Sequence, residues 1–353
     1  MKSHQFTPIA AAFTIFAVAL SGCAAGGAGS GDPGATEDPP ADADHVTVQL
    51  DYTVRGNHAM FFVADELGYF ADEGIVVDAI TKGPGSPDAM RIVGGGQADF
   101  GFGDLPTLAS ARAQGVEVTA LAAVNQSTPL SMCSLSDKHT LDEPSDLEGL
   151  NIGVHPAGST YIFWKALLAA NGMTATDVQE LTVTPPYESY LLTEQVDAVI
   201  CYIDAEVPEL QAKAGGEGSL SILHGADYGY DVYGSGMFTN DKLIEEDPDL
   251  VQRFTNAYIR AFEYVIENPA EAAEITAASS KELRDKAGVF EEQIQADIEF
   301  TFESDDTESA GLGAMTTEMW ASTIDVLETQ GVIEEAPAPE DVFDPSFAGN
   351  ASQ

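Results

Sequence analysis

Asn57 and His58 stand in a polar loop between a predicted strand, Val46–Leu50, and a predicted helix that ends at Gly68. The helix places apolar residues at positions i, i+3, i+4 and i+7, which is the spacing of a buried face. An amide and an imidazole can both donate and accept hydrogen bonds, and α/β sheets place ligand contacts where a strand leads into a helix. We therefore expect both residues to contact a ligand, with Asn57 also capping the helix. For His58, a hydrogen bond to the backbone at the helix start is an equal alternative.

Polar side chains that can also form hydrogen bonds stand at the starts of two later predicted helices. Asp104 precedes a helix with proline in its first turn, and it is expected to cap that helix or contact a ligand. Ser159 and Thr160 open the predicted helix Tyr161–Ala170, where hydroxyl groups cap the helix or hold a polar or anionic ligand group. Tyr161 itself faces either the cleft or the core. These residues extend the list of ligand contacts that the sequence predicts.

The motifs of several common enzyme classes are missing from the sequence. It contains no G-x-S-x-G, H-E-x-x-H or C-x-x-C motif and no phosphate-binding P-loop. The six histidines are not spaced as metal ligands. The sequence therefore predicts no catalytic residue, no metal site and no cofactor.

The charge balance is strongly acidic. The chain has 14 Lys and Arg against 58 Asp and Glu, which gives a net charge of -44. Such a surface repels nucleic acid and anionic membrane faces, so nucleic acid is not expected as a partner. Because the acids are spread along the chain, they indicate a strongly hydrated surface instead of an acidic tail.

The N-terminal residues are typical of an export signal. An apolar run from Pro8 to Leu20 is too short to span a membrane comfortably. Leu20-Ser21-Gly22-Cys23 resembles a bacterial lipobox. We therefore expect a lipoprotein signal peptide at 1–22, lipidation of Cys23 and a flexible Gly-, Ala- and Pro-rich tether at 23–44. Ordinary secretory cleavage is the alternative, and both alternatives export the protein.

Two further cysteines, Cys133 and Cys201, lie in the exported part of the chain. A disulfide between them is possible in an oxidising compartment, but the sequence does not place the two side chains together. Buried free thiols are therefore the expectation.

Strand and helix patterns alternate from His45 onward, which predicts an α/β protein of two lobes. A second lobe starts after Pro129, and an apolar strand near Tyr233 returns the chain to the first lobe, where almost wholly helical sequence follows. The predicted divisions are lobe 1 at 45–130 and 233–340, lobe 2 at 131–232, and a tail at 341–353. Two crossings between lobes make a hinge around an interlobe cleft.

Several motifs resemble those of a known family. They are L-D-Y-T at 50–53, N-H at 57–58, G-Y-F at 68–70, E-G-I at 73–75, G-G-G-Q-A-D-F-G at 94–101, A-R-A-Q-G at 111–115, D-L-E-G-L at 146–150 and Q-V-D-A-V at 195–199. With these motifs the chain resembles the extracytoplasmic solute-binding proteins of ABC importers over roughly residues 46–265. It is similar to the branch that binds thiamine pyrimidine precursors and is related to hydroxymethylpyrimidine synthase.

The resemblance implies a periplasmic-binding-protein-like type II fold with the C-terminal helices on the first lobe. It implies a lipid-anchored, monomeric subunit that captures an aminopyrimidine, of the hydroxymethylpyrimidine or formylaminopyrimidine type, and delivers it to a permease and its ATPase. The alternatives are binding of a sulfonate, taurine or nitrate, and binding of riboflavin or another flat heterocycle. A hydroxymethylpyrimidine-synthase-like enzyme is the alternative of another class, although the cysteine-rich iron segment of the fungal enzyme is missing from this sequence.

A flat aminopyrimidine needs aromatic faces and an acceptor for its exocyclic amine. Tyr52 stands at the family's aromatic position, and further tyrosines cluster in later loops: Tyr187, Tyr190, Tyr202 and Tyr233. The segment Cys201–Pro208 resembles the family's segment that ends in an acid before a proline, which makes Glu206 the candidate carboxylate. Because Val207 stands between the acid and the proline here, Asp204 competes for that role.

Arginine or lysine side chains are what a sulfonate or nitrate binder would require. Arg55 is the cation available in the candidate loops, with Lys82 as a weaker alternative, and Arg55 can also face solvent. This shortage favours a neutral or cationic heterocycle as the ligand.

Overall fold

The structure is a computed structural model, and it describes residues 43–351. The predicted signal peptide, Cys23 and nearly all of the predicted tether lie outside the described residues. Within 43–351, no helix is both long enough and apolar enough to cross a membrane.

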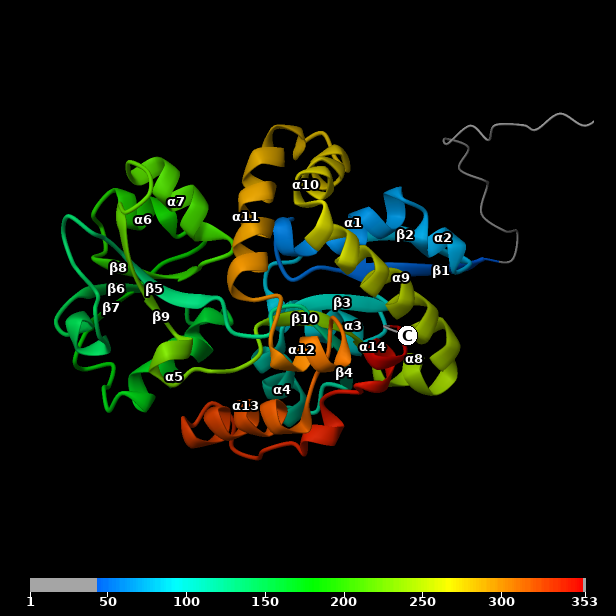
Figure 1. The fold of residues 1–353 in the computed structure, drawn as a ribbon. Coiled ribbons are helices and arrows are strands. Elements are labelled where there is room, and N and C mark those ends of the chain that lie inside the picture. The colour runs from blue at the N-terminus through cyan, green and yellow to red at the C-terminus, as the bar shows by residue number, and fades with distance from the viewer. Residues whose placement is uncertain (1–42, 352–353) are drawn as a thin grey trace, which may run out of the picture. The chain divides into compact units, whose positions relative to one another are not determined.

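The first lobe is built on a five-stranded sheet with the strand order β2-β1-β3-β10-β4 (Figure 1). β1 runs parallel to β2 and β3, whereas β10 runs antiparallel to β3 and β4. The chain makes β10 only after it has completed the second lobe. The strands are β1 (Asp44–Gln49), β2 (Ile75–Thr81), β3 (Phe100–Asp104), β4 (Val118–Ala123) and β10 (Ser235–Asn240).

Helices cover both faces of this sheet. Those made before the second lobe are α1 (Ala59–Glu66), α2 (Tyr69–Asp72), α3 (Ser86–Gly94) and α4 (Leu105–Ala113). Those made after it are α8 (Asp241–Glu246), α9 (Pro248–Glu267), α10 (Pro269–Ala278), α11 (Ala287–Phe300), α12 (Asp305–Ala310), α13 (Thr317–Thr329) and α14 (Ser346–Ala351). α14 belongs to the predicted tail, and its Phe347 packs into the first-lobe core.

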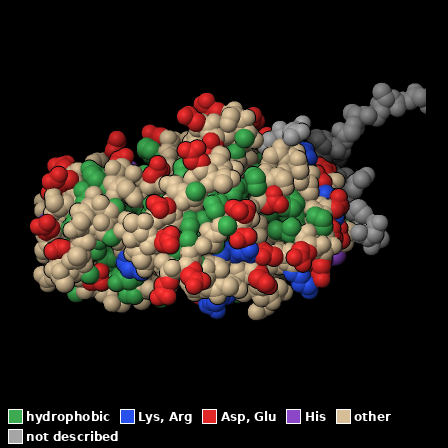
Figure 2. All heavy atoms as spheres, turned by 90° about the horizontal axis from the view of Figure 1, so that it is seen from below, with side chains coloured by type: hydrophobic (Ala, Val, Ile, Leu, Met, Phe, Trp, Pro, Cys, Tyr) green, Lys and Arg blue, Asp and Glu red, His purple; other side chains and the backbone are tan. Residues whose placement is uncertain are grey.

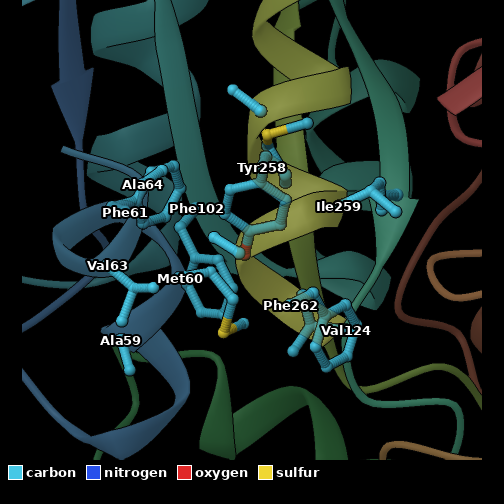
Figure 3. Close-up of a cluster of buried hydrophobic side chains, with 14 of the residues drawn as sticks. Ala59, Met60, Phe61, Val63, Ala64, Phe102, Val124, Tyr258, Ile259 and Phe262 are labelled. Carbon is cyan, nitrogen blue, oxygen red and sulfur yellow. The ribbon is translucent and has the colours of Figure 1, made fainter. Parts of the chain in front are cut away.

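The larger core cluster of this lobe packs α1 and α9 against the sheet, including β1, β3 and β4. Figure 3 shows Met60 and Phe61 of α1 close to Phe102 of β3 and to Tyr258 of α9. The rings of Phe61 and Tyr258 lie 4.7 Å apart between centroids. Burial of such large aromatic side chains fixes α1, and with it the polar loop before α1.

The second lobe has its own five-stranded sheet, with the order β7-β6-β8-β5-β9. β6 runs parallel to β7 and β8, and β5 runs antiparallel to β8 and β9. The strands are β5 (Leu130–Leu135), β6 (Asn151–Val154), β7 (Gln179–Thr182), β8 (Ala198–Tyr202) and β9 (Leu220–His224). Its helices are α5 (Thr160–Ala170), α6 (Glu188–Leu192) and α7 (Glu206–Ala214).

A disulfide joins Cys133 of β5 to Cys201 of β8. The expectation of free thiols was therefore wrong. Antiparallel pairing of these two strands brings the Cα atoms to 6.0 Å, which is within bonding range. A separation of 68 residues along the chain gives no sign of that pairing.

The chain crosses between the lobes twice, between β4 and β5 and between β9 and β10. The two crossing segments pair with each other: the backbone N–H of Asn125 donates to Ser235 O at 3.0 Å, and that of Gly234 donates to Asn125 O at 2.9 Å. A Cβ atom on Gly234 would lie 2.6 Å from Asn125 Cβ, so the close approach requires glycine.

Two predicted helix caps differ from the structure. Asn57 lies inside a 3₁₀ turn, η1 (Gly56–His58), and its side chain makes no capping hydrogen bond. The sequence also predicts Ser86 as the cap of a helix that runs to the glycines at 94–96. In the structure Ser86 is the first residue of α3, and its hydroxyl accepts instead from the backbone N–H of Asp104. Both side chains are taken up by contacts between distant segments, which override local capping preferences.

Asp and Glu side chains are scattered over the face of the molecule shown in Figure 2, and Lys and Arg are fewer there. This distribution matches the expectation of a hydrated acidic surface on that face.

Candidate functional site

A cavity of about 470 Å³ lies between the two lobes. This volume is within the range of small-molecule sites. The first lobe contributes Asp51–Arg55, Pro84–Ser86, Lys286, Phe290 and Gln293, and the second contributes His155, Gly158–Thr160, Pro185–Glu188, Tyr202, Ala205, Glu206, Glu209 and Lys213.

Residues at or just after the carboxyl ends of several strands line this cavity. Tyr52 follows β1, His155 follows β6, and Tyr187 follows β7 after a short loop. Tyr202 is the last residue of β8. This is the edge at which parallel sheets place ligand contacts, so the lining comes from equivalent edges of both sheets.

Arg55 lies between two aromatic rings from different lobes. Its guanidinium carbon is 5.8 Å from the ring centroid of Tyr52 and 5.2 Å from that of Tyr202. A nitrogen of the guanidinium, Nη2, donates to Asp51 Oδ2 at 3.2 Å, and the two side chains are only 11% and 8% exposed. The alternative that Arg55 faces solvent was therefore wrong. The cation instead joins the tyrosines through cation–π contacts.

His58 holds Asp51 from the opposite side. Its Nδ1 accepts from the backbone N–H of Arg55 at 3.1 Å, so the imidazole proton is on Nε2, which donates to Asp51 Oδ1 at 3.0 Å. Burial lowers the pKa of His58 despite the neighbouring carboxylate, which keeps the ring neutral. The alternative for His58, a hydrogen bond to the backbone at the helix start, is therefore present in the structure.

Asp51 is ionised in this arrangement. Burial alone would raise its pKa, but the charge of Arg55 and the hydrogen bond from His58 together bring that pKa below its ordinary value. The carboxylate of Asp51 therefore cancels the charge of Arg55 at neutral pH.

Glu206 faces the cavity as the first residue of α7. Its Oε2 accepts from the backbone N–H of Tyr202 at 3.0 Å. Burial raises the pKa of Glu206 to about 7, against the opposing effect of Arg55. Near neutral pH the group can therefore accept a hydrogen bond as a carboxylate or donate one as a carboxylic acid.

The competing acid, Asp204, does not line the cavity. It is 2% exposed, and its Oδ2 accepts from Asn57 Nδ2 at 3.4 Å. Asn57 is also outside the cavity lining, so this pair connects the lobes without facing the cavity.

Hydroxyl groups of the second lobe form pairs along one wall. Tyr202 Oη and Ser159 Oγ are 3.2 Å apart, and Tyr187 Oη lies 3.1 Å from His155 Nδ1. Thr160 lines the same wall. These contacts orient the two tyrosines, so the wall combines aromatic faces with polar edges.

His58 is outside the cavity lining as well, and three other predicted site residues lie away from the cavity. Asp104 accepts from the backbone N–H of Thr107 and caps α4, as one of its two predicted roles required. Tyr161 donates to Glu180 Oε2 at 3.3 Å. Tyr233 is fully buried, and its Oη accepts from the backbone N–H of Thr316 at 2.8 Å. Tyr190, which the sequence grouped with them, packs against a second-lobe core.

No local pattern in the sequence indicates the α11 side chains in the cavity wall. Gln293 Oε1 accepts from the backbone N–H of Gly56 at 2.8 Å, and its Nε2 donates to Ala205 O at 3.1 Å. A Cβ atom on Gly56 would lie 2.7 Å from Gln293 Cβ, so only glycine allows this approach. His155 was also missed, although its place after a strand and before a helix could have indicated it.

Residues 55–272 match the NMT1/THI5-like family. A formylaminopyrimidine-binding protein from Halalkalibacterium halodurans is 26% identical over 301 residues, which cover 84% of this chain and 89% of that protein. A 4-amino-5-hydroxymethyl-2-methylpyrimidine phosphate synthase from Legionella pneumophila is 26% identical over 240 residues, which cover 68% and 75% of the two chains.

The fold is similar to that of the periplasmic aliphatic sulphonate binding protein SsuA from Escherichia coli. The TM-score is 0.65 at 12% identity, and the match covers 86% of this chain and 93% of that protein. This likeness confirms the predicted two-lobed α/β fold of periplasmic binding proteins. Because the family match spans more than half of the 353 residues and most of the cavity lining, the chain belongs to the NMT1/THI5-like family.

Proposed function

We propose that this protein is the extracytoplasmic solute-binding subunit of an ABC importer and that it captures an aminopyrimidine precursor of thiamine, of the formylaminopyrimidine or hydroxymethylpyrimidine type. Closure of the lobes holds the ligand, a permease with its ATPase receives it, and no reaction follows. The observation that carries this proposal is the interlobe cavity, in which tyrosine rings stand with a carboxyl group and an arginine whose charge is already cancelled.

The cavity chemistry suits the edge of an aminopyrimidine. Such a ring presents an amine donor beside a nitrogen acceptor. A carboxyl group with a pKa of about 7, as in Glu206, can accept from the amine and, when protonated, donate to the ring nitrogen. Tyr52 and Tyr202 offer aromatic faces for the flat ring.

An anion such as a sulfonate or nitrate fits the cavity less well. Arg55 already pairs with Asp51. Lys213 lies 3.1 Å from Glu209 and 3.8 Å from Glu188. Since the cations near the cavity have acidic partners or, like Lys286, lie exposed at its edge, a neutral or weakly cationic ligand is favoured.

The family includes a synthase, so an enzyme is the alternative of another class. The disulfide takes up Cys133 and Cys201, two of the three cysteines of the chain. This supports a binding protein over an enzyme with a cysteine-rich iron segment. Lipidation at Cys23 and a monomeric state complete the proposal, and mass spectrometry and light scattering of the purified protein test them.

A ligand panel tests the function. The panel contains hydroxymethylpyrimidine, formylaminopyrimidine, thiamine, riboflavin, taurine, an alkanesulfonate and nitrate, and the readout is thermal unfolding of the purified protein. At 100 times its dissociation constant, a ligand stabilises the folded state by about 2.7 kcal/mol. We expect an aminopyrimidine to do so. Stabilisation by taurine or nitrate alone would contradict the ligand class, and turnover of any compound would contradict the binding role.

Glu206→Gln tests the proposed carboxyl contact by calorimetry. Loss of a hydrogen bond to a charged group costs about 1.5–3 kcal/mol, so we expect affinity to fall at least about tenfold. Glu217→Gln is the control, because Glu217 is exposed beyond the end of α7. Unchanged affinity of Glu206→Gln would remove Glu206 from the site.

A further inference from the structure

Two buried carboxyl groups from different lobes meet outside the cavity lining. Asp204 lies between β8 and α7 of the second lobe, and Asp297 lies on α11 of the first. They are 2% and 0% exposed. Gln293, one turn before Asp297 on α11, donates to Ala205 O, next to Asp204, at 3.1 Å, and each of the two carboxyl groups acts on the pKa of the other. The two groups therefore face each other across the interface between the lobes.

The hydrogen bonds from other residues leave one oxygen of each carboxyl group without a donor. Asp297 Oδ1 accepts from Asn125 Nδ2 at 2.6 Å and from Thr301 Oγ1 at 2.8 Å. Asp204 Oδ2 accepts from Asn57 Nδ2 at 3.4 Å. Among the described residues, no hydrogen-bond donor reaches Asp204 Oδ1 or Asp297 Oδ2. Two carboxylate oxygens are both acceptors, so a hydrogen bond between the groups requires a proton on one of them.

The surroundings favour retention of that proton. Burial and the charge of Asp204 raise the pKa of Asp297 well above its ordinary value, and the groups that contact Asp297 directly, Asn125 and Thr301, are neutral. Burial also raises the pKa of Asp204, where Arg55 opposes the shift and Asp51 adds to it. Glu206 is the further titratable group that interacts with Asp204. The two aspartates therefore titrate as a pair.

We propose that Asp204 and Asp297 share one proton that joins the two lobes, so that loss of this proton at higher pH favours the open arrangement. The pair is tied to the crossing segments, because Asn125 donates to Asp297 and its Oδ1 accepts from the backbone N–H of Ser235 at 3.2 Å. The inference goes beyond ligand capture and does not depend on which ligand binds.

The direction of the effect follows from proton linkage. In the open arrangement each carboxyl group is hydrated and its pKa returns toward the ordinary range, so the closed arrangement binds more protons. The closed-to-open ratio is therefore highest at low pH and falls as pH rises through the pKa of the pair. For one proton, the fall is up to about tenfold per pH unit.

The test uses the purified, ligand-free protein. Carboxyl carbons of aspartate are titrated by NMR, and the radius of gyration is followed by small-angle X-ray scattering over the same pH range. We expect one titration, shared by the Asp204 and Asp297 signals and well above the usual carboxyl range, with expansion at the same pH. Separate titration of both groups in the ordinary range would overturn the proposal, and this measurement needs no variant.

Asp204→Asn and Asp297→Asn supply a pH-independent amide donor to the remaining carboxylate. We expect the pH-dependent expansion to disappear in each variant. Asp104→Asn is the control, since that buried carboxyl group caps α4 within the first lobe, and Glu206→Gln removes the cavity carboxyl group that also titrates near neutral pH. The expansion should persist in both controls. The shared proton would be refuted if the pH-dependent expansion persisted in Asp204→Asn. It would also be refuted if the expansion depended on cation concentration instead of pH.

Discussion

The ion pair between Asp51 and Arg55 predicts a change in ligand charge preference when the carboxylate is removed. Asp51→Asn keeps the shape of the side chain and deletes the charge that faces Arg55 Nη2 at 3.2 Å. Because the two side chains are only 8% and 11% exposed, the variant leaves a buried arginine without its ion-pair partner. Breaking a buried pair in this way typically costs about 3–5 kcal/mol. Urea unfolding should show a loss of this size.

The same variant should accept anions better than the unchanged protein does. A bound alkanesulfonate or nitrate can replace the missing carboxylate beside Arg55, and charge-assisted hydrogen bonds of this kind contribute about 1.5–3 kcal/mol. We expect anion affinity, measured by calorimetry, to rise at least about tenfold in Asp51→Asn. Part of the lost stability should also return at high anion concentration.

Asp44→Asn is the matched control. Asp44 pairs with Arg253 at 2.7 Å, but the two side chains are 45% and 24% exposed, so its loss should cost less than about 1 kcal/mol. An Asp51→Asn protein with unchanged stability and no gain in anion binding would refute the reasoning that Asp51 neutralises Arg55.

Two further predictions concern stability. Replacing Cys133 and Cys201 by alanine opens a covalent loop with a sequence separation of 68. Urea unfolding should then show that the free energy of unfolding falls by about 4 kcal/mol. A fall of less than about 1 kcal/mol would contradict this loop-entropy estimate. Burial raises the pKa of Asp104 from 3.8 to about 6 despite hydrogen bonds from Thr107. The protonated form of Asp104 therefore stabilises the folded state fully below about pH 4, and this stabilisation is lost as pH rises through about 6. Asp104→Asn, which still caps α4, should flatten this part of the stability–pH curve, and an unchanged curve would refute the assignment.

Regular elements were the part of the fold that local pattern could predict. The sequence pattern predicts a helix at 248–267, and this helix is α9 (Pro248–Glu267), because Asp247 caps it, proline occupies its first position and apolar residues recur along one face. The pattern also predicts a strand at Asn151–Val154, and β6 has the same bounds. Such elements are specified by neighbouring residues, so the sequence carries their signal directly.

The direction of a side chain depends on distant segments, which is why the candidate site was harder to predict. Tyr233 has the chemistry of a ligand-binding residue, but its ring packs on Trp320, 87 residues later in the chain, with ring centroids 5.6 Å apart. Asn57 has the chemistry of a helix cap, but its amide reaches Asp204 in the other lobe. Gln293 contacts Gly56 across 237 residues, a pairing that no local pattern contains.

The many acidic residues of the chain affect the charge balance of the cavity through Arg55. With 14 basic and 58 acidic residues, a buried arginine meets several acids: Asp51, Asp204 and Glu206 all act on its charge. Only Asp51 has a lowered pKa, whereas burial raises the pKa of the other two. Asp51 is thus the fixed negative charge that pairs with Arg55, whereas the charge of Glu206, with a pKa of about 7, changes with pH near neutrality. A cavity of this kind favours a neutral ligand near neutral pH and, on the proposed mechanism, opens more readily as pH rises.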